Sequence, residues 1–412
     1  MINLFFVVHD YSGARTYAEE LLGYLVTQKG IAVHKVFLNS IYFKEYTKIK
    51  EGNMTVIHIP AIHRETVSLE KYAKRCIDLM APILLGKQDL IFHLNYRTQI
   101  YLGIEARKRF EAHIVYTLHF LPNYFSYLAS EEQSSYNLIA TSDELAIQIT
   151  KEADHVICVT RFARESVMKW YKAPGNKVTA IHNGIGLKNQ YQPISLKQKE
   201  QIKKRLGFSK GEQIILFVGM LDKRKGIKHL VAVFNKISAK IHHARLVIAG
   251  VGNFDTVFNY AEGCWSKITL TGRIPKETVK QLCQIADIGA IPSVFEQCSY
   301  VALEMMQYGL PVVVTAAPGL KELYEDGRNA LIVPLGNSDH TTMDLEVQED
   351  ELEKMILRLL NNKKLRKEIG DNAFYSWLTN FTSVQMGQAT KKIYKQIQTE
   401  TIKLNTDEIL IQ

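Results

Sequence analysis

The stretch PSVFEQCSYVALEMMQYGLPVVVT, residues 292–315, decides the fold of this chain. The apolar run 288–291 precedes it, and Ser299 then opens a segment with helical character that ends near Gly309. Pro311 begins a second apolar run that ends at Thr315. The stretch is therefore one unit of a strand–helix–strand alternation, and both apolar runs are short and continuous enough to be buried strands.

The same alternation continues in both directions from this stretch. Strand-like runs lie at 2–8, 32–38, 56–59, 90–94, 113–118 and 156–160 in the first half, and at 214–219, 245–250, 268–270, 288–291, 311–315 and 330–333 in the second. Nearly continuous apolar strands separated by helices are typical of parallel sheets covered on both faces. The sequence predicts an α/β protein with two doubly wound, Rossmann-like domains.

Polar composition marks the expected domain boundaries. We expect a first domain over 1–185, a Lys- and Gln-rich linker over 186–208, a second domain over 209–375 and a loose tail over 399–412. Ligands of doubly wound sheets bind outside the carboxyl ends of the strands. The default site is therefore a central cleft that the two domains face.

Composition excludes several other classes of protein. The chain has 412 residues, of which 46% are hydrophobic and 23% charged, as in soluble globular proteins. Its five cysteines form no C-x-x-C pair, which favours a reducing compartment over a disulfide frame or a zinc ribbon. The net charge of +9 is concentrated in residues 188–245, where 14 Lys and Arg stand against three acidic residues. This region is either a solvated basic face or an anion site.

Two glutamates in the deciding stretch are candidate ligand-binding residues. Glu296 precedes the expected helix and Glu304 lies inside it, and eight helical residues span about 12 Å. The two carboxylates cannot serve one atom, but they can hold two parts of an elongated ligand. The first-turn amides of Ser299, Tyr300 and Val301 are donors suited to a phosphate. The alternative is an ordinary pair of surface glutamates.

A basic turn follows the strand at 214–219. Lys223, Arg224 and Lys225 stand directly before Gly226, where a helix is expected to begin. Such a turn at the carboxyl end of a strand can clamp a diphosphate. Lys225 is the strongest candidate, whereas Lys223 and Arg224 are individually better explained as solvated side chains.

Two residues of the first half are weaker candidates. Gly13, between the first strand and the first helix, would let a ligand approach the backbone. The surrounding residues do not form G-x-G-x-x-G, which disfavours a nicotinamide oxidoreductase. His119 follows an apolar strand, where a structural histidine is the commoner case.

Taken together, these segments resemble the retaining nucleotide-sugar glycosyltransferases of family 4, which have the GT-B fold. The resemblance covers nearly the whole chain and is most specific in residues 292–315. Further matching segments, in the family's order, are ADHVICVTRFARESV, KVTAIHNGI, LFVGMLDKRKGI, LVIAGVGN and ITLTGRIPKETVKQLCQIADIGAIPS.

The resemblance implies roles for residues of the second half. Glu296 would contact the hydroxyls of the donor sugar, and Glu304 would hold the ribose of the nucleotide. Lys225 would grip the diphosphate together with the amides that follow Cys298. Arg273 and Ile274 would line the base pocket.

It implies roles in the first half as well. Gly13 would let the first loop approach the phosphates or the sugar, and His119 would lie beside the reacting sugar on the acceptor side. The C-terminal helix, about 376–398, would pack back on the first domain.

The chain departs from the family pattern at four places. Met220 replaces the usual Arg, so one diphosphate contact is missing unless Lys223 or Arg224 supplies it. Ala14 follows Gly13 where many relatives have a second glycine, Gly186 replaces an Asp, and Cys298-Ser299 replaces Phe-Gly. These changes bear on the donor sugar and on phosphate geometry.

The expected activity is hexosyl transfer, with retained anomeric configuration, from a nucleoside diphosphate sugar (UDP or GDP) to an acceptor hydroxyl in glycan biosynthesis of bacterial type. The acceptor class stays open among glycans, lipid-linked molecules, peptides and small molecules. The alternatives are an epimerase of GT-B architecture and a catalytically silent nucleotide-sugar binding protein. No Asp-x-Asp occurs, so we expect no metal, and no cofactor besides the donor.

The expected location is cytoplasmic, because the start lacks a basic region before its apolar run and no apolar run is long enough to span a membrane. Residues 1–185 hold 21 Lys and Arg against 18 Asp and Glu, a weak net charge. We therefore expect no nucleic-acid partner and at most a peripheral contact with the inner membrane face.

Overall fold

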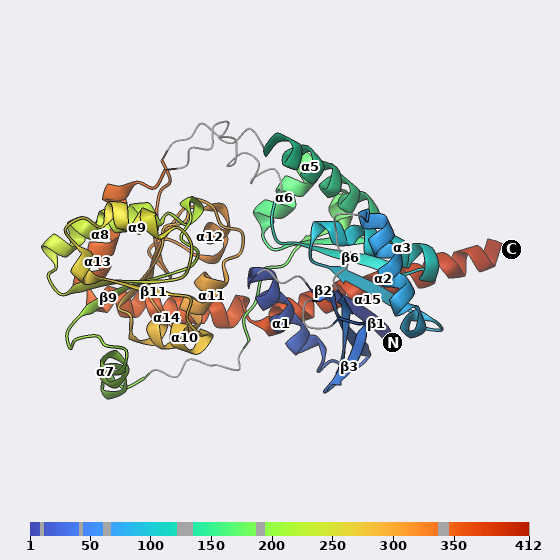
Figure 1. The fold of residues 1–412 in the computed structure, drawn as a ribbon, viewed down its shortest axis with the longest axis horizontal. Helices are drawn as coiled ribbons and strands as arrows, with labels where there is room; N and C mark the ends of the chain where they lie inside the picture. Colours follow the sequence, from blue (N-terminus) through green and yellow to red (C-terminus); the bar gives the residue numbers. More distant parts are fainter. Residues whose placement is uncertain are drawn as a thin grey trace. The chain divides into compact units, whose positions relative to one another are not determined.

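The chain forms two units, each built on a parallel sheet (Figure 1). The computed structural model describes residues 1–8, 12–40, 44–60, 67–121, 135–186, 194–336 and 346–411. Unit 1 comprises Met1–Gly184 and Ser383–Gln412, and unit 2 comprises Ile185–Thr382. The prediction of two doubly wound α/β domains is confirmed.

The sheet of unit 1 has the strand order β3-β4-β2-β1-β5-β6-β7-β8. Among the strands that the structure describes in this sheet, only the β3–β4 pair is antiparallel. Its strands are β1 (Ile2–Val8), β2 (Ile31–Ser40), β3 (Thr47–Glu51), β4 (Met54–Pro60), β5 (Leu90–Leu94), β6 (His113–Leu118), β7 (His155–Cys158) and β8 (Val178–Ala180). Its helices are α1 (Ser12–Leu25), α2 (Leu69–Leu84), η2 (Arg97–Gln99), α3 (Ile100–Phe110), α5 (Ser135–Glu152), α6 (Arg161–Trp170), η3 (Gly175–Lys177) and α15 (Ser383–Ile411).

Strand β1 lies at the centre of the core of unit 1, between β2 and β5. Its successive residues point to opposite faces of the sheet, so it contributes side chains to both faces. Phe5 stacks between His34 and Phe92 of the adjacent strands, with ring centroids 4.4 and 5.1 Å away. Phe6 lies on the other face, beside Tyr17 of α1. All seven residues of β1 are buried, as a strand covered on both faces requires.

Helix α15 completes unit 1 from the far end of the chain. It crosses α1 so closely that a Cβ on Gly387 would lie 2.1 Å from the ring of Tyr24. Farther along, the hydroxyl of the buried Tyr394 lies 2.5 Å from Nδ1 of His93. The residues from 399 onward, which we expected to be a loose tail, continue this helix to Ile411.

The sheet of unit 2 has the order β11-β10-β9-β12-β13-β14 and is parallel throughout. Its strands are β9 (Gln213–Val218), β10 (Ala244–Ala249), β11 (Ile268–Gly272), β12 (Ile288–Ile291), β13 (Val312–Thr315) and β14 (Leu331–Val333). Its helices are α7 (Leu196–Arg205), η5 (Lys223–Lys225), α8 (Ile227–Lys240), α9 (Phe254–Tyr260), η6 (Trp265–Lys267), α10 (Lys276–Ile285), α11 (Tyr300–Gln307), α12 (Pro318–Leu323), α13 (Glu349–Asn361) and α14 (Lys363–Asn380).

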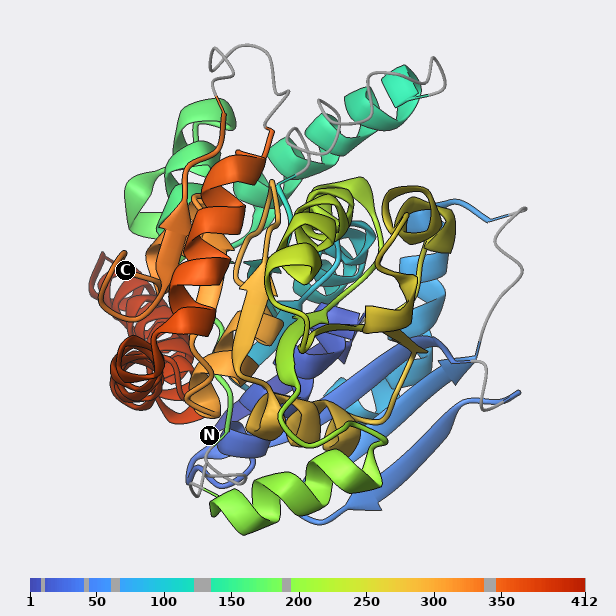
Figure 2. The ribbon, with the colours of Figure 1, turned by 90° about the vertical axis from the view of Figure 1, so that its left-hand side faces the viewer.

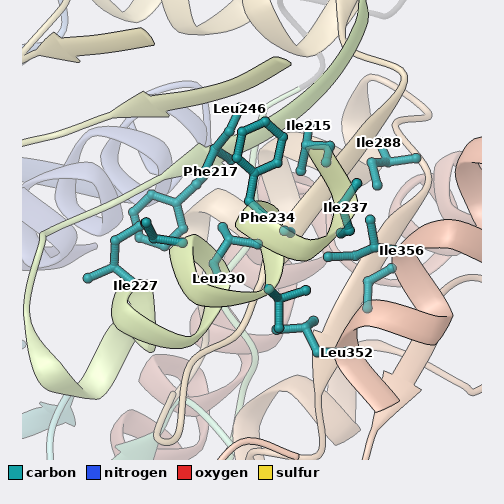
Figure 3. Packing of buried hydrophobic residues seen from close by; sticks show 14 of the residues in the cluster. Ile215, Phe217, Ile227, Leu230, Phe234, Ile237, Leu246, Ile288, Leu352 and Ile356 are labelled. Atoms are coloured by element: carbon teal, nitrogen blue, oxygen red, sulfur yellow. The ribbon is translucent and has the colours of Figure 1, made fainter. Parts of the chain in front are cut away.

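One face of this sheet is covered by α8 and α13, which lie side by side in both ribbon views (Figures 1 and 2). Leu230 and Phe234 of α8 pack between the strands and Leu352 of α13 (Figure 3). Burying side chains of this size contributes about 1.5–3 kcal/mol each. This core holds β9 and β12 rigidly in place as neighbours.

The polar segment expected to be a linker, 186–208, contains helix α7, which is part of unit 2. The ammonium of Lys203 donates to the carbonyl of Glu212 at 2.6 Å, and Lys199 lies 3.5 Å from Asp287. Burial lowers the pKa of Lys199, and the attraction of Asp287 opposes that shift. The lysines that gave the segment its linker-like composition thus attach α7 to the ends of the strands of unit 2. Residues 187–193 of the segment lie outside the described part of the chain.

Candidate functional site

The strand order of unit 2 defines where a ligand is expected. The chain leaves β9 towards β10 on one side, and later returns to β12 on the other side of β9. This reversal is the topological switch point, where ligands of doubly wound sheets bind beyond the carboxyl ends of the strands. The segments that follow these two strands are 219–226 and 292–299, which contain the basic turn and the first of the two glutamates.

These two segments pack backbone against backbone. Gly226 has a φ of +65°, and a Cβ there would lie 1.9 Å from the carbonyl oxygen of Pro292. The amide of Val294 donates to the carbonyl of Arg224 at 2.8 Å. Only glycine allows this approach with this backbone conformation. The contact sets the position of Lys225 relative to Glu296.

Lys225 and Glu296 form an ion pair across the switch point, although 71 positions separate them in the sequence. The Oε1 atom of Glu296 accepts from the ammonium of Lys225 and from the hydroxyl of Ser293, which lies 3.1 Å away. The Glu296 side chain is 9% exposed and that of Lys225 is 27% exposed. One anionic and one cationic group thus meet at a partly open position.

The backbone around Glu296 is held from the other side by α12. The amide of Gly319 donates to the carbonyl of Glu296 at 3.1 Å. A Cβ on Gly319 would lie 1.4 Å from the carbonyl oxygen of Gln297. No side chain fits at this position, so residue 319 must be glycine if segment 292–299 is to keep its path.

We therefore expect Gly319→Ala to destabilise the protein and to displace Glu296. The atoms that the new Cβ would meet all belong to the backbone of Glu296 and Gln297. A clash of this kind costs about 1–3 kcal/mol or more. Gly23→Ala is the matched control, because Gly23 is also helical but has no atom within 4 Å of the Cβ position. That change should be neutral or slightly stabilising. Thermal unfolding of both variants tests this, and equal midpoints would contradict it.

Helix α11 begins as the sequence predicted. Ser299 is its N-cap, and the Ser299 hydroxyl accepts from the amide of Ala302 at 3.4 Å. The amides of Tyr300 and Val301 open the first turn, where the helix dipole favours an anion.

Glu304 lies on the same helix and is half-buried. Burial raises the pKa of the Cys283 thiol, and the charge of Glu304 raises it further.

The other cations of the basic turn are placed differently from Lys225. The Arg224 guanidinium lies 2.6 Å from Asp222, which also accepts from the amide of Lys225 at 3.1 Å. Lys223 is exposed. Met220, where the resemblance led us to expect Arg, is half-exposed. Of the three cations, Lys225 is the one that reaches Glu296.

The loops after β10 and β11 continue the same edge of the sheet. The amide of Gly250 donates to the carbonyl of Gly272 at 3.0 Å, and a Cβ on Gly250 would lie 1.7 Å from the carbonyl of Gly219. Arg273, the residue after Gly272, is exposed, and Ile274 is half-buried. Glycines thus bring Arg273 and Ile274 to the edge that carries Lys225 and Glu296.

The two candidates of the first half lie in unit 1. Gly13 is exposed, with open space around its Cβ position, but it belongs to the first turn of α1 rather than to the turn before it. His119 follows β6 and is half-buried, and its Nε2 lies 3.1 Å from Oδ1 of Asn95. Sequence reasoning did not identify Asn95, although its place directly after β5 was an available signal.

Within the described residues, no cluster of three or more His, Cys, Asp and Glu side chains has the arrangement of a metal site. In the same part of the chain, no helix is both long and apolar enough to span a membrane.

The chain resembles known proteins in both of its units. Residues 198–375 match the family model of glycosyl transferases group 1, and residues 11–189 match that of glycosyltransferase family 4. An uncharacterised glycosyltransferase of Methanocaldococcus jannaschii is 31% identical over 60% of this chain and 61% of that protein. Alpha-maltose-1-phosphate synthase of Mycolicibacterium smegmatis is 24% identical over 69% of this chain and 73% of the relative.

Solved structures share the fold at low sequence identity. Sucrose-phosphate synthase from Thermosynechococcus elongatus superposes with a TM-score of 0.77 and 20% identity, covering 97% of this chain and all of that one. HepE of Anabaena, solved in complex with UDP-glucose, gives a TM-score of 0.70 at 15% identity, covering 96% of this chain and all of that one.

Proposed function

Because the chain belongs to the glycosyltransferases of group 1 and family 4, we propose that it transfers a hexose from a nucleoside diphosphate sugar to an acceptor hydroxyl, with retention of the anomeric configuration. The observation that carries the proposal is the Lys225–Glu296 ion pair at the switch point of unit 2. We assign the donor to unit 2 and the acceptor to unit 1.

The ion pair matches the two chemically different ends of such a donor. A diphosphate can replace Glu296 as the partner of Lys225, and sugar hydroxyls can replace Lys225 as donors to Glu296. Each member then keeps a hydrogen-bonded partner, so a partly buried charge is not left unpaired. A ligand with only one of the two groups would leave either the cation or the carboxylate without its partner.

The same groups fit the charge changes of the reaction. The leaving diphosphate gains negative charge as the glycosidic bond breaks, and the sugar becomes oxocarbenium-like. Lys225 and the first-turn amides of α11 are preorganised donors for that charge, which is an effective form of transition-state stabilisation. Glu304, which lies on α11 eight residues after Glu296, is assigned to the ribose. Arg273 and Ile274 are assigned to the base.

The donor class has one further support. HepE and a trehalose-6-phosphate protein from E. coli, both structural neighbours, were solved with UDP-glucose and UDP-2-fluoro glucose. We therefore propose UDP as the first nucleotide to test and GDP as the second. We also propose a cytoplasmic site of action, an acceptor that is a glycan, lipid-linked molecule, peptide or small molecule, and no cofactor beyond the donor.

The test is a transfer assay preceded by a binding screen. We expect one nucleoside diphosphate sugar to raise the unfolding temperature, because a ligand at 100 times its dissociation constant adds about 2.7 kcal/mol. Proton NMR of the product should then show the anomeric configuration of the donor. Conversion of the donor without acceptor would instead indicate an epimerase. Binding without turnover on any acceptor would indicate a silent binding protein, and inversion would refute retention.

A further inference from the structure

Aromatic side chains gather at one place on the surface of unit 2. Phe258 is 50% exposed, Tyr260 is 45% exposed and Trp265 is 41% exposed. In the described part of the chain, no other stretch of eight residues carries three exposed large hydrophobic side chains. An apolar patch that a soluble protein leaves open to water often marks a binding site. We call these three residues the aromatic patch.

Helix α9 and the turn after it hold the aromatic patch in place. Val257 and Ala261 of α9 belong to the core of the unit, where α9 lies against α8 (Figure 1). The amide of Cys264 donates to the carbonyl of Ala261 at 3.0 Å, and this turn brings Trp265 back to Phe258. The two ring centroids lie 5.1 Å apart. Each ring limits the rotation of the other, so a ligand meets them already ordered.

The aromatic patch lies away from the proposed donor site of the same unit. Trp265 begins η6, which leads into the amino end of β11. Lys225 and Glu296 instead follow the carboxyl ends of β9 and β12. The strands of this sheet are parallel, and a strand of five residues such as β11 is about 16 Å long. Changes in the aromatic patch therefore leave the residues assigned to the donor untouched.

The size of the aromatic patch argues against a second copy of this chain as its occupant. A whole aromatic side chain covers about 150–250 Å², so three half-exposed rings offer roughly 200–350 Å². A stable protein interface buries about 800 Å² on each partner. A few sugar rings, stacked face to face on the aromatic rings, can cover the smaller area.

The charges around the aromatic patch argue against an anionic occupant. Asp255 and Glu262 are both exposed within the same segment of chain. Two cations adjoin the patch, and both are engaged: Lys267 donates to the carbonyl of residue 238 at 2.7 Å, and Arg245 pairs with Glu212 at 2.8 Å. An anionic membrane, a nucleic acid and an acidic polysaccharide are all attracted by cations. This surface suits an uncharged ligand better.

A neutral sugar chain matches both features of this surface. One face of a pyranose ring consists of C–H groups, which the negative face of an aromatic ring attracts. The hydroxyls at the rim of the sugar can donate to the carboxylates of Asp255 and Glu262 and to the amide oxygen of Asn259, which is exposed beside Phe258. Aromatic rings thus meet the apolar face of the ligand, and acceptors meet its hydroxyls.

We propose that the aromatic patch is a binding site for a neutral oligosaccharide or polysaccharide, separate from the donor site. This statement stands on the surface of unit 2 alone. The further statement, that the bound sugar chain is the acceptor or its growing end, rests on the proposed function. The two statements have separate tests.

Binding is tested by native gel electrophoresis of the full-length protein in gels that contain dextran, amylopectin, galactomannan or xyloglucan, all of them neutral. We expect at least one of these polymers to retard the wild type. Trp265→Ala should raise the dissociation constant about tenfold, because truncated aromatic anchors are among the costliest changes at binding surfaces. Trp265→Tyr keeps a ring and should retain most of the binding. Retardation by none of the four polymers would overturn the proposal.

Trp170→Ala is the matched control, because Trp170 lies on α6 of unit 1 and is 38% exposed, close to the value for Trp265. This variant should be retarded like the wild type. Equal losses in Trp170→Ala and Trp265→Ala would refute a site at the aromatic patch. The same samples are sedimented alone and with phosphatidylcholine vesicles. If Trp265→Ala abolishes self-association or vesicle binding instead of retardation, the occupant is a second copy or a membrane and the proposal is wrong.

The link to the proposed function is tested in the transfer assay. We expect Trp265→Ala to raise KM about tenfold for a long sugar-chain acceptor and to leave kcat unchanged, because the variant loses anchoring but no contact of the reaction. A short acceptor, which cannot reach the aromatic patch, should keep its KM. If KM rises for neither acceptor, the bound chain is not the acceptor. The gel experiment needs no donor and no turnover, so failure of the proposed function leaves its result intact.

Discussion

Replacement of Glu296 by glutamine is expected to lower kcat about a hundredfold, the scale observed when one preorganised electrostatic contact to a transition state is removed. The amide keeps the size of the side chain and can still accept from Ser293, whose hydroxyl lies 3.1 Å away. What it loses is the negative charge that faces Lys225 and, in our proposal, the hydroxyls of the donor sugar. The loss should therefore appear in turnover more than in stability.

Steady-state kinetics with thermal unfolding of the same samples tests this expectation. The matched control is Glu325→Gln, which removes a carboxylate of the same unit whose ion pair with Arg328 is exposed and worth at most about 1 kcal/mol. The control should keep wild-type turnover. If Glu296→Gln is as active as the control, Glu296 has no part in the reaction.

Lys225→Ala is expected to weaken binding of free UDP by about ten- to a hundredfold, because a hydrogen bond to a charged group contributes about 1.5–3 kcal/mol. The change removes the cation and also leaves the Glu296 carboxylate, which is 9% exposed, without its partner. That carboxylate would then repel the diphosphate. Both effects act in the same direction.

Isothermal titration calorimetry with UDP alone measures this effect without any turnover. Lys236→Ala is the control, because Lys236 belongs to the neighbouring helix α8 and its partner Asp350 is 94% exposed. The double variant Lys225→Ala/Glu296→Gln should bind more tightly than the sum of the single losses predicts, since paired residues are not additive. If Lys223→Ala abolishes binding while Lys225→Ala has no effect, the diphosphate contact belongs to Lys223.

The strands could be predicted from sequence where burial dictated their composition. The range 113–118 for β6 and the range 288–291 for β12 agree with the structure because most positions inside a two-sided sheet are apolar. Strand β3, TKIKE, was missed because four of its five residues are exposed and its formation depends on antiparallel pairing with β4. Charged side chains are one means by which an edge strand avoids pairing with another chain.

The candidate site was predictable in its residues but not in its contacts. Lys225 stood out because it precedes a glycine at the end of a strand, and Glu296 because of its spacing from Glu304. Nothing local to either residue indicates that they form an ion pair, since that pairing depends on β9 and β12 being neighbours. Gly319 could not be identified either, because the atom that excludes a side chain there belongs to Gln297.

The division of the chain between the units has a consequence for its synthesis. Unit 2 is one continuous segment, so all of it is available once residue 382 has been made. Unit 1 lacks α15 (Ser383–Ile411) until the whole of unit 2 has been made. Until then His93 has no Tyr394 hydroxyl beside its Nδ1, and Tyr24 has no helix packed against its ring. Synthesis of unit 1 therefore starts before that of unit 2 and is completed after it. In the interval unit 1 exposes an apolar face that other nascent chains can contact.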